Sequence, residues 1–360
     1  MSGGIDSSVA AVLLKNAGHE VVGVTAKILL CADMDGCEPR YDVCCSPESM
    51  KAAREIARAF AFPHVLLDVE EDFSREIIDP FCSEYLAGRT PSPCIHCNAR
   101  IKFRKLIEFA SSLGCEKLAT GHYARLGVTD SGRHYVSAGL DRDKDQSYFL
   151  FALGQDILRG VIFPLGERRK EEIRMMASDL GLAVADRPES QEICFVQDND
   201  YPRYIERRTG SIPPPGDIVS TGGKVLGRHR GIHRYTIGQR RGLGIAAERP
   251  LYVVGIDAAR NVVIAGFREE LFRSGLFARD ITLMKAPSLD GIGALVKTRS
   301  TQRPFAATLS ERDGGVEVRF AEPQAGITPG QAAVFYDESG DVLGGGWIAE
   351  TVSAMDAAAA

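Results

Sequence analysis

The first eight residues combine residue types that bind phosphate. The sequence Met1-Ser2-Gly3-Gly4-Ile5-Asp6-Ser7-Ser8 has two glycines, which permit a tight turn close to a ligand, followed by serine hydroxyls. The apolar run 9–14 predicts a helix, so the N–H groups of the loop would lie at a helix N-terminus and attract an anion. Asp6 stands where ordinary kinase loops have lysine, and a carboxylate beside phosphate needs a bridging cation. We therefore predict a nucleotide phosphate site with Mg²⁺ at Asp6.

Cysteines form the second reactive group. Cys94 and Cys97 lie in Arg89-Thr90-Pro91-Ser92-Pro93-Cys94-Ile95-His96-Cys97-Asn98, which leads into a basic run. The two prolines indicate an extended approach, and we expect Cys97 at or next to a helix N-terminus with Asn98 as a cap. The helix dipole there favours a thiolate. Cys194, in Glu189-Ser190-Gln191-Glu192-Ile193-Cys194-Phe195-Val196, is by itself equally compatible with a buried core thiol.

Four more thiols lie close together in the first quarter of the chain. They are Cys31, Cys37, Cys44 and Cys45. Such a group can hold zinc, but the adjacent pair and the irregular spacing do not match a standard zinc finger. We favour a variable loop with incidental thiols.

The elements that must position these residues alternate between helix and strand. We expect helices at 8–17, 46–61, 72–87 and 98–113, and buried strands at 20–26, 63–69 and 117–120. This alternation is typical of an α/β fold with a doubly wound parallel sheet, in which ligands bind at the carboxyl ends of the strands. Ala26, Gly121 and the opening loop all lie at such ends.

The composition of the sequence changes near residue 200. Prolines 213–215, frequent glycines and short β-branched runs indicate a small β-rich module. Six short strands then follow near 280–284, 292–299, 304–311, 315–320, 332–336 and 342–349, and their regular spacing predicts a β-barrel. We therefore expect domains at 1–198, 199–269 and 270–360.

Composition narrows the class of protein. With 44% hydrophobic and 25% charged residues, the 360-residue chain has the profile of a soluble protein. It has no apolar run of membrane-spanning length and no signal peptide, and its nine cysteines favour thiol or metal chemistry in a reducing compartment, so we expect a cytoplasmic protein. The net charge of −5 does not itself indicate a polyanion partner, although Arg240 and Arg241 could form a local basic patch.

Seven motifs, in order, resemble one known family. They are SGGIDSS, RTPSPCIHCNARIKF, ATGHY, KDQSYFL, ESQEICFV, YTIGQRRGLGI and TPGQ, and together they extend over most of the chain. The chain resembles the tRNA-specific 2-thiouridylases of the MnmA (TrmU) family, which belong to the PP-loop ATP pyrophosphatases. The resemblance implies a PP-loop domain, a small central domain and a C-terminal β-barrel.

The resemblance also implies a reaction. ATP would adenylate the C2 carbonyl of the wobble uridine, in tRNAs that accept lysine, glutamate and glutamine, and sulfur would then replace the oxygen. Cys194 would carry a persulfide received from a cysteine desulfurase or a sulfur-relay protein. Cys97 would act as the nucleophile that attacks this persulfide, leaving a Cys97–Cys194 disulfide. The nucleotide would contact Met1, Ser2, Gly3, Gly4, Ile5, Asp6, Ser7, Ala26 and Gly121.

The same resemblance assigns contacts with tRNA. The matching positions are Ser92, Pro93, Cys94, His122, Lys144, Asp145, Gln146, Arg299, Ser300 and Gln331. Arg240, Arg241, Arg299 and Arg303 are our candidates for phosphate contacts. The chain departs from the family pattern at Ala26, where relatives usually have methionine.

Cys94 is a second departure, because many relatives have aspartate there. With Cys97 and Cys194 it supplies three soft ligands, so an iron–sulfur cluster that holds the sulfur atom is an alternative to persulfide chemistry. Another PP-loop adenylating enzyme, such as an amide-forming synthetase, would not need the paired cysteines. A non-catalytic tRNA-binding protein would not need the intact loop.

The start of the chain carries a further expectation. A phosphate loop of this kind normally follows a buried parallel strand, whereas Met1 already lies in the loop. We expect that the start has been assigned one strand too late, and that upstream residues would strengthen ATP binding.

Overall fold

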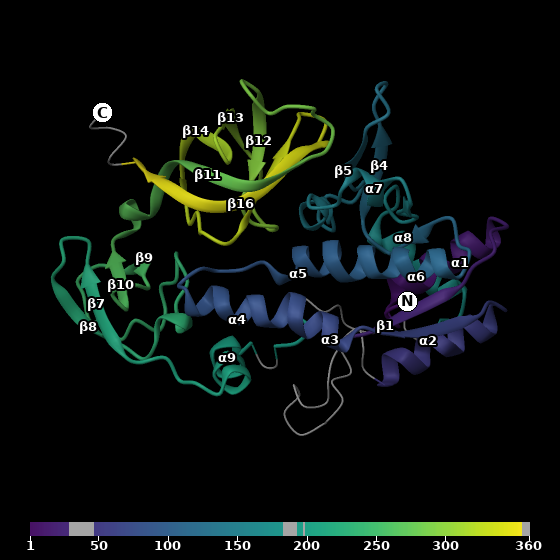
Figure 1. The fold of residues 1–360 in the computed structure, drawn as a ribbon, viewed down its shortest axis with the longest axis horizontal. Coiled ribbons are helices and arrows are strands. Elements are labelled where there is room, and N and C mark those ends of the chain that lie inside the picture. The colour runs from purple at the N-terminus through teal and green to yellow at the C-terminus, as the bar shows by residue number, and fades with distance from the viewer. Residues whose placement is uncertain (29–46, 183–192, 197–198, 355–360) are drawn as a thin grey trace. The chain divides into compact units, whose positions relative to one another are not determined.

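The structure is a computed structural model that describes residues 1–28, 47–182, 193–196 and 199–354 (Figure 1). The chain divides into two compact units. The first contains Met1–Ile78, Pro93–Asn199 and Gly340–Val342, and the second contains Asp79–Ser92, Asp200–Ser339 and Leu343–Ala360. In the described part of the chain, no helix has the length and apolar character that crossing a membrane requires.

Parallel strand pairs form the centre of the first unit. Strand β1 (Gly23–Lys27) pairs in parallel with β2 (His64–Asp68), and β3 (Leu118–Ala119) pairs in parallel with β6 (Val161–Ile162). Among the described residues these are two separate hydrogen-bonded pairs. The expected parallel α/β arrangement is confirmed, with strands shorter than the apolar runs that predicted them.

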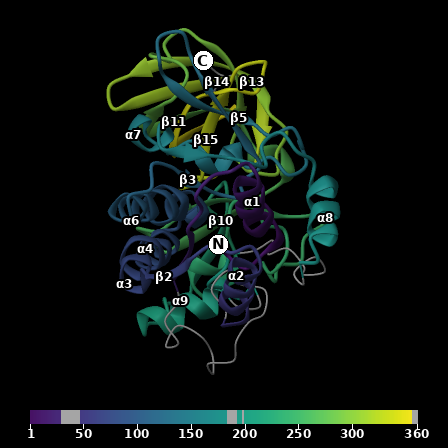
Figure 2. The same ribbon diagram turned by 90° about the vertical axis from the view of Figure 1, so that its right-hand side faces the viewer.

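Helices of the first unit pack around these strands. Helix α1 (Ile5–Asn16) buries Ile5 and residues 8–12, as its nearly continuous apolar run requires, and α2 (Pro47–Ala59) buries one face only. Helix α1 packs against α8 (Lys170–Asp179), and Figure 2 shows the two side by side. Their buried side chains share one hydrophobic core with Tyr123 and Leu165.

Residues 70–86 and 93–112 are helical, close to the two expected helices. The first run contains α3 (Glu70–Phe73), the π-helical η3 (Ser74–Ile78) and α4 (Asp79–Leu86). The second contains α5 (Pro93–His96), the π-helical η4 (Cys97–Lys105) and α6 (Leu106–Ser112). The π-turns add a residue per turn without breaking the helix, and such insertions are frequent at functional sites.

The expected extended approach through Pro93 is wrong, because the helix already begins at this residue. Proline suits the first helical position, where an N–H would lack an intrahelical partner and the fixed φ angle is already helical. Asn98 is therefore not a cap. It is buried inside the helix, and its Nδ2 donates to the carbonyl oxygen of Phe149 at 3.2 Å.

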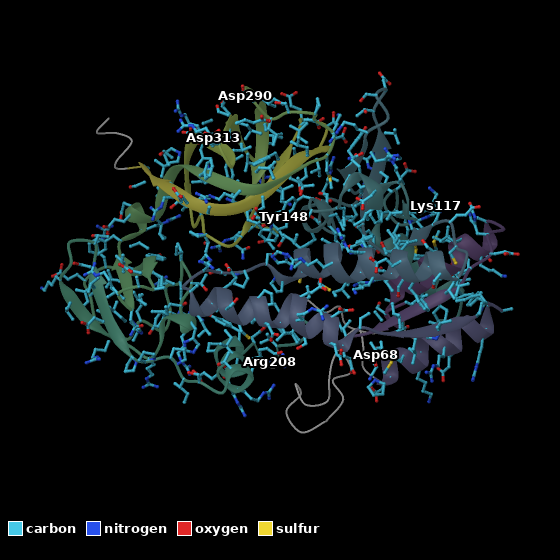
Figure 3. The ribbon with its side chains drawn as sticks, in the orientation of Figure 1. Asp68, Lys117, Tyr148, Arg208, Asp290 and Asp313 are labelled. Carbon is cyan, nitrogen blue, oxygen red and sulfur yellow. The ribbon has the colours of Figure 1, made fainter. Side chains whose placement is uncertain are left out.

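The remaining elements of the first unit are short. Strands β4 (Ala124–Val128) and β5 (His134–Ala138) form an antiparallel hairpin. Residues Ser147–Leu150 form the 3₁₀ helix η5, in which Tyr148, labelled in Figure 3, is fully buried. Helix α7 (Gln155–Leu158) completes the unit.

The second unit contains a four-stranded sheet and two helices outside it. The strand order is β8 (Val225–His229), β7 (Gly216–Ser220), β10 (Val262–Gly266) and β9 (Tyr252–Asp257). Helix α9 (Tyr201–Thr209) packs against α4. Arg208 forms an ion pair with Asp79 of α4 at 2.8 Å, and Tyr201 stacks on Tyr85 of the same helix. Two 3₁₀ helices, η6 (Ile232–Arg234) and η7 (Arg268–Leu271), connect the strands.

The predicted six-stranded barrel is confirmed. Its closed order is β11 (Phe272–Leu283), β14 (Gly315–Ala325), β13 (Phe305–Arg312), β12 (Gly293–Lys297), β15 (Ala332–Tyr336) and β16 (Val342–Ser353) (Figure 1). Alternate side chains of these strands fill the barrel, among them Leu276, Val296 and Phe335, which are fully buried. Closure removes unpaired strand edges.

Replacing the buried aromatic ring of the barrel tests this core. We expect Phe335→Ala to lower the free energy of unfolding by about 3–5 kcal/mol, because it removes a fully buried ring and leaves a cavity. Trp347 of β16 is the only tryptophan of the chain, so its fluorescence in a urea titration reports on the barrel. The control Val352→Ala, at a position 46% exposed on the same strand, should change stability by less than about 0.5 kcal/mol. Equal losses in the two variants would contradict the described core.

Candidate functional site

The opening loop leaves the N-terminus of α1 accessible to an anion. Gly4 precedes the helix in an extended conformation and has no side chain to cap it. The hydroxyls of Ser7 and Ser8 donate to the carbonyl oxygen of Gly4 at 3.3 and 2.8 Å, and the N–H of Ser2 donates to Ser7 Oγ at 3.0 Å. The serines thus hold the turn, while the N–H groups of the first helical turn point out of the helix as an anion site requires.

Two glycines are required because the loop is closely surrounded. Gly3 has φ +70°, and a Cβ atom there would lie 2.2 Å from the carbonyl oxygen of Ser49 in α2. A Cβ atom on Gly121 would lie 2.8 Å from Asp6 C and Ser7 N. The structure therefore brings Gly121, which follows β3, against the loop.

The carboxylate of Asp6 is held by two residues that sequence reasoning missed. Lys170 Nζ donates to Asp6 Oδ1 at 2.7 Å and to Oδ2 at 2.9 Å, and the hydroxyl of Tyr123 donates to Oδ1 at 2.7 Å. The Lys170 side chain is 5% exposed, whereas that of Asp6 keeps 32% of its surface in contact with solvent. Lys170 is 164 residues from Asp6 in the chain, so no local pattern indicates this pair.

The other predicted nucleotide contacts lie beside the loop. Ala26 belongs to β1, whose Thr25 hydroxyl donates to the carbonyl oxygen of Met1 at 2.6 Å. Lys27 pairs with Glu70 at 2.8 Å and with Asp68, labelled in Figure 3, at 3.4 Å. The carboxyl end of β1 and the loop therefore lie on the same edge of the first unit.

The two cysteine segments are both attached to α3. Phe195, the residue after Cys194, packs edge-to-face on Phe73 with ring centroids 5.8 Å apart. The helix that carries Cys97 is tied to α3 by an ion pair between Lys105 and Asp72 at 2.9 Å. Cys97 and Cys194 are present as thiols, Cys97 buried and Cys194 half-buried.

The cysteines that the structure describes are not arranged as a metal site. Within the ranges that the structure describes, no group of three or more His, Cys, Asp or Glu side chains has the arrangement to hold a metal ion. Cys94 is exposed, whereas Cys97, one helical turn later, is buried. The four cysteines Cys31, Cys37, Cys44 and Cys45 lie outside the described residues.

Three of the residues expected to contact tRNA are packed into the first unit. Asp145 accepts hydrogen bonds from the N–H groups of Gly139 and Ser147 at 3.1 and 3.0 Å. The Gln146 Oε1 atom accepts from the N–H of Tyr123 at 3.0 Å. His122 packs on Phe103, with ring centroids 5.6 Å apart, and burial lowers the pKa of His122 to about 3.

In the second unit, two side chains that are expected to contact tRNA donate hydrogen bonds to backbone carbonyl oxygens. Arg299 Nη2 donates to the carbonyl oxygens of Ile237 and Gly326 at 3.3 and 3.0 Å. Gln331 Nε2 donates to the carbonyl oxygens of Thr90 and Pro91 at 2.9 and 3.1 Å. Gln331 therefore shapes the segment that precedes Ser92, and Arg299 connects the backbone of Ile237 with that of Gly326.

The remaining expected contacts differ in exposure. Ser92 and Pro93 are buried, and Lys144 and Ser300 are half-buried. The candidate phosphate-binding arginines Arg240, Arg241 and Arg303 are exposed. Exposed guanidinium groups suit phosphate contacts, because they need no desolvation before they meet a polyanion.

Comparison with known proteins covers nearly the whole chain. A family model described as "tRNA methyl transferase HUP domain" matches residues 1–198, one described as "tRNA methyl transferase PRC-barrel domain" matches 203–266, and one described as "Aminomethyltransferase beta-barrel domain" matches 273–348.

Curated relatives are similar over their full length. The tRNA-specific 2-thiouridylase MnmA of Geobacter metallireducens is 48% identical over 350 residues, which are 97% of this chain and 95% of the relative. The protein of the same name from Geotalea uraniireducens is 48% identical over 99% of this chain and 96% of the relative. The one from Salinibacter ruber is 45% identical over 100% and 95%.

The pKa of His122 makes stability depend on pH. Because this pKa is about 3 in the folded protein and about 6.5 in an unfolded chain, the unfolded state binds the proton first as the pH falls. The contribution of His122 is complete above pH about 6.5 and is lost progressively towards pH about 3. We expect His122→Gln to make urea stability, followed by circular dichroism, less dependent on pH between about 6.5 and 4.5.

A histidine on the surface provides the control. His19 is exposed, and His19→Gln should leave the pH dependence of the wild type in place. An unchanged pH dependence in His122→Gln would show that His122 titrates normally in the folded protein.

Proposed function

Because the chain belongs to the family of tRNA-specific 2-thiouridylases, we propose that it replaces the C2 oxygen of the wobble uridine of tRNA with sulfur, at the expense of ATP. It is a sulfurtransferase. The observation that carries the proposal is the identity of 48% to a 2-thiouridylase over 97% of this chain. The retained loop at α1 and the cysteines Cys97 and Cys194 supply the two chemistries that this reaction needs.

The first step activates a poor leaving group. The C2 oxygen of uridine leaves readily only after it has been adenylated, which consumes ATP and releases pyrophosphate. The N-terminus of α1 and the turn Ser2–Ser7 would bind the phosphates, and Asp6, whose carboxylate remains partly exposed, would hold Mg²⁺. A bound Mg²⁺ supplies charge neutralisation of the phosphates.

The second step delivers sulfur from a thiol carrier. We infer that Cys194 receives a persulfide from a cysteine desulfurase or a sulfur-relay protein, because its half-buried thiol remains accessible to a donor. The Cys97 thiolate attacks Cys194 Sγ, the S–S bond of the persulfide breaks, and the released sulfur bonds to C2 as AMP departs with the oxygen. A Cys97–Cys194 disulfide results, and a dithiol reductant must supply two electrons before the next cycle.

The attachment of both cysteine segments to α3 supports this division of roles. A disulfide requires Cα atoms within about 7 Å, so a resolving cysteine must be brought to the carrier with little freedom. The contacts Phe195–Phe73 and Lys105–Asp72 fix the two segments to one helix. Burial of Cys97 keeps it from reacting with external oxidants before the persulfide arrives.

The exposed arginines of the second unit are suited to binding the phosphate backbone of a tRNA. A tRNA backbone would be contacted by Arg240, Arg241 and Arg303, and the tRNAs that accept lysine, glutamate and glutamine are the expected substrates. An amide-forming PP-loop synthetase is disfavoured, because it has no use for the paired cysteines.

Nucleoside analysis of tRNA tests the function directly. Deletion of the gene should remove 2-thiouridine derivatives from total tRNA, as measured by mass spectrometry, and the wild-type gene should restore them. Another adenylating enzyme or a binding protein predicts unchanged 2-thiouridine, so persistence of the nucleoside would refute the proposal.

Cysteine variants separate the persulfide route from the cluster route. We expect Cys97→Ser and Cys194→Ser each to lower sulfur transfer by at least about 100-fold while ATP binding is retained, because serine cannot carry or resolve a persulfide. Cys115→Ser, at a half-buried thiol outside both segments, is the matched control and should remain active. Activity is measured with a persulfide donor, tRNA and Mg·ATP.

Cys94→Ser decides between the routes. In the persulfide route it keeps most of its activity, because Cys94 is exposed and has no step to perform. Loss of activity in Cys94→Ser, together with iron and sulfide in anaerobically purified wild type, would establish the cluster route instead.

A further inference from the structure

Two adjacent exposed arginines, Arg240 and Arg241, lie in the segment 236–242 of the second unit, which we call the arginine loop. A hydrogen bond from the N–H of Gln239 to the carbonyl oxygen of Thr236, at 3.0 Å, closes a four-residue turn directly before them. The third residue of this turn is a glycine with φ +91°, a conformation that other residues rarely adopt. The two cations thus follow a turn of defined shape.

The side chain of Gln239 bridges the start and the end of the arginine loop. Its Oε1 atom accepts a hydrogen bond from the N–H of Thr236 at 3.0 Å, and its Nε2 atom donates to the carbonyl oxygen of Arg241 at 2.9 Å. Both polar atoms of this side chain therefore have backbone partners within the loop. Gln239 accordingly acts on the course of the backbone that carries the two arginines.

Neighbouring elements hold the base of the arginine loop. The N–H of Gly238 donates to the carbonyl oxygen of Val253 in β9 at 2.8 Å, and the N–H of Val253 donates to the carbonyl oxygen of Gln239 at 2.9 Å. Arg299 Nη2 donates to the carbonyl oxygen of Ile237 at 3.3 Å. The backbone of the loop is thus fixed at several points, whereas its two arginines are exposed.

A fixed backbone favours the binding of a polyanion. An arginine side chain loses rotamer freedom when it meets a phosphate, and a mobile loop would add backbone entropy to this cost. Two adjacent guanidinium groups also repel each other, so a mobile loop would favour conformations in which they are far apart. A loop that is ordered before binding avoids both losses.

We propose that Gln239 is a positioning residue for tRNA, which holds the arginine loop in the conformation that presents Arg240 and Arg241 to phosphates of the tRNA backbone. This inference rests on the proposed function and deepens it, because it names the residue that orders the two arginines. Gln239 acts through the loop and not by touching the RNA. Its loss therefore affects binding only as long as the two arginines are present.

Binding of tRNA at several salt concentrations tests the arginines first. The ligand is an in vitro transcript of a tRNA that accepts glutamate, and fluorescence anisotropy measures its affinity for the full-length protein. Arg240→Ala with Arg241→Ala should lower the slope of log affinity against log salt by about 1.5–2, because each phosphate contact contributes about 0.7–0.9. An unchanged slope would contradict the phosphate contacts and with them the role of Gln239.

Gln239→Met tests the positioning role, because methionine has a similar length and forms neither hydrogen bond. We expect this variant to bind tRNA about tenfold more weakly, since the loop and both arginines must then be ordered on binding. In the background of Arg240→Ala with Arg241→Ala, the same change should weaken binding by less than about twofold. An equal factor in both backgrounds would show that Gln239 acts independently of the arginines, and the inference would be wrong.

Gln324→Met is the matched control. Gln324 in β14 is half-buried, as Gln239 is, and its Nε2 atom also donates to a carbonyl oxygen two residues away, that of Glu322 at 3.0 Å. Because Gln324 lies outside the arginine loop, this variant should bind tRNA as wild type does. Weakening equal to that of Gln239→Met would contradict a role specific to Gln239.

Gln239→Asn guards against a folding defect, which circular dichroism in urea detects in either variant. Asparagine keeps a polar amide at this half-buried position, but it is one methylene too short to bridge Thr236 and Arg241. Binding should therefore weaken by at least about threefold when the arginines are present, and remain unchanged when they are absent. Wild-type affinity in folded Gln239→Asn would contradict the inference.

Failure of this inference can be distinguished from failure of the proposed function. Wild-type protein that binds no tRNA, together with 2-thiouridine that persists after deletion of the gene, would contradict both. Wild-type protein that binds tRNA, with Gln239→Met unaffected, would contradict the role of Gln239 alone and leave sulfur transfer standing.

Discussion

The close packing of the loop Ser2–Ser8 against its surroundings is the constraint on which the first unit depends. Backbone atoms of Asp6 and Ser7 lie so near Gly121 that a Cβ atom would not fit, and Gly3 meets Ser49 of α2 in the same way. The helix N–H groups can bind an anion only if the loop keeps this course. The Asp6–Lys170 pair then adds α8 to the same support, so one short loop fixes the relative positions of three helices and the segment after β3.

Local signals explain why the elements of the chain could be predicted. Apolar runs predicted α1 and α2, buried runs alternating with helices predicted the parallel strands, and the six regular runs after residue 270 predicted the closed barrel. Each of these signals lies within the element that it predicts. The error at Pro93 has a local cause as well, because Pro91 and Pro93 were interpreted alike, although proline is unfavourable inside a helix and favourable at its first position.

Contacts between distant residues explain what the sequence could not reveal. Lys170 and Asp6 are 164 residues apart, and Gln331 lies 241 residues from Thr90, whose carbonyl oxygen it binds. The polar type of Gln331, Arg299 or Asp145 does not indicate whether the side chain faces RNA or its own backbone. Buried carbonyl and N–H groups need partners, and only the fold decides which side chains provide them.

Two cysteines of one helix, Cys94 and Cys97, differ in burial and therefore suit different chemical roles. Cys94 is exposed and Cys97 is buried, although only two residues lie between them and both follow the same prolines. The π-helical segment begins at Cys97, and Cys97 and Asn98 are both buried, with Asn98 Nδ2 donating to the backbone carbonyl of Phe149. A cluster would need these thiols to point to one centre, whereas a resolving thiol needs only protection and one approach. The burial of Cys97 next to an exposed Cys94 therefore suits a thiol that waits for a single partner.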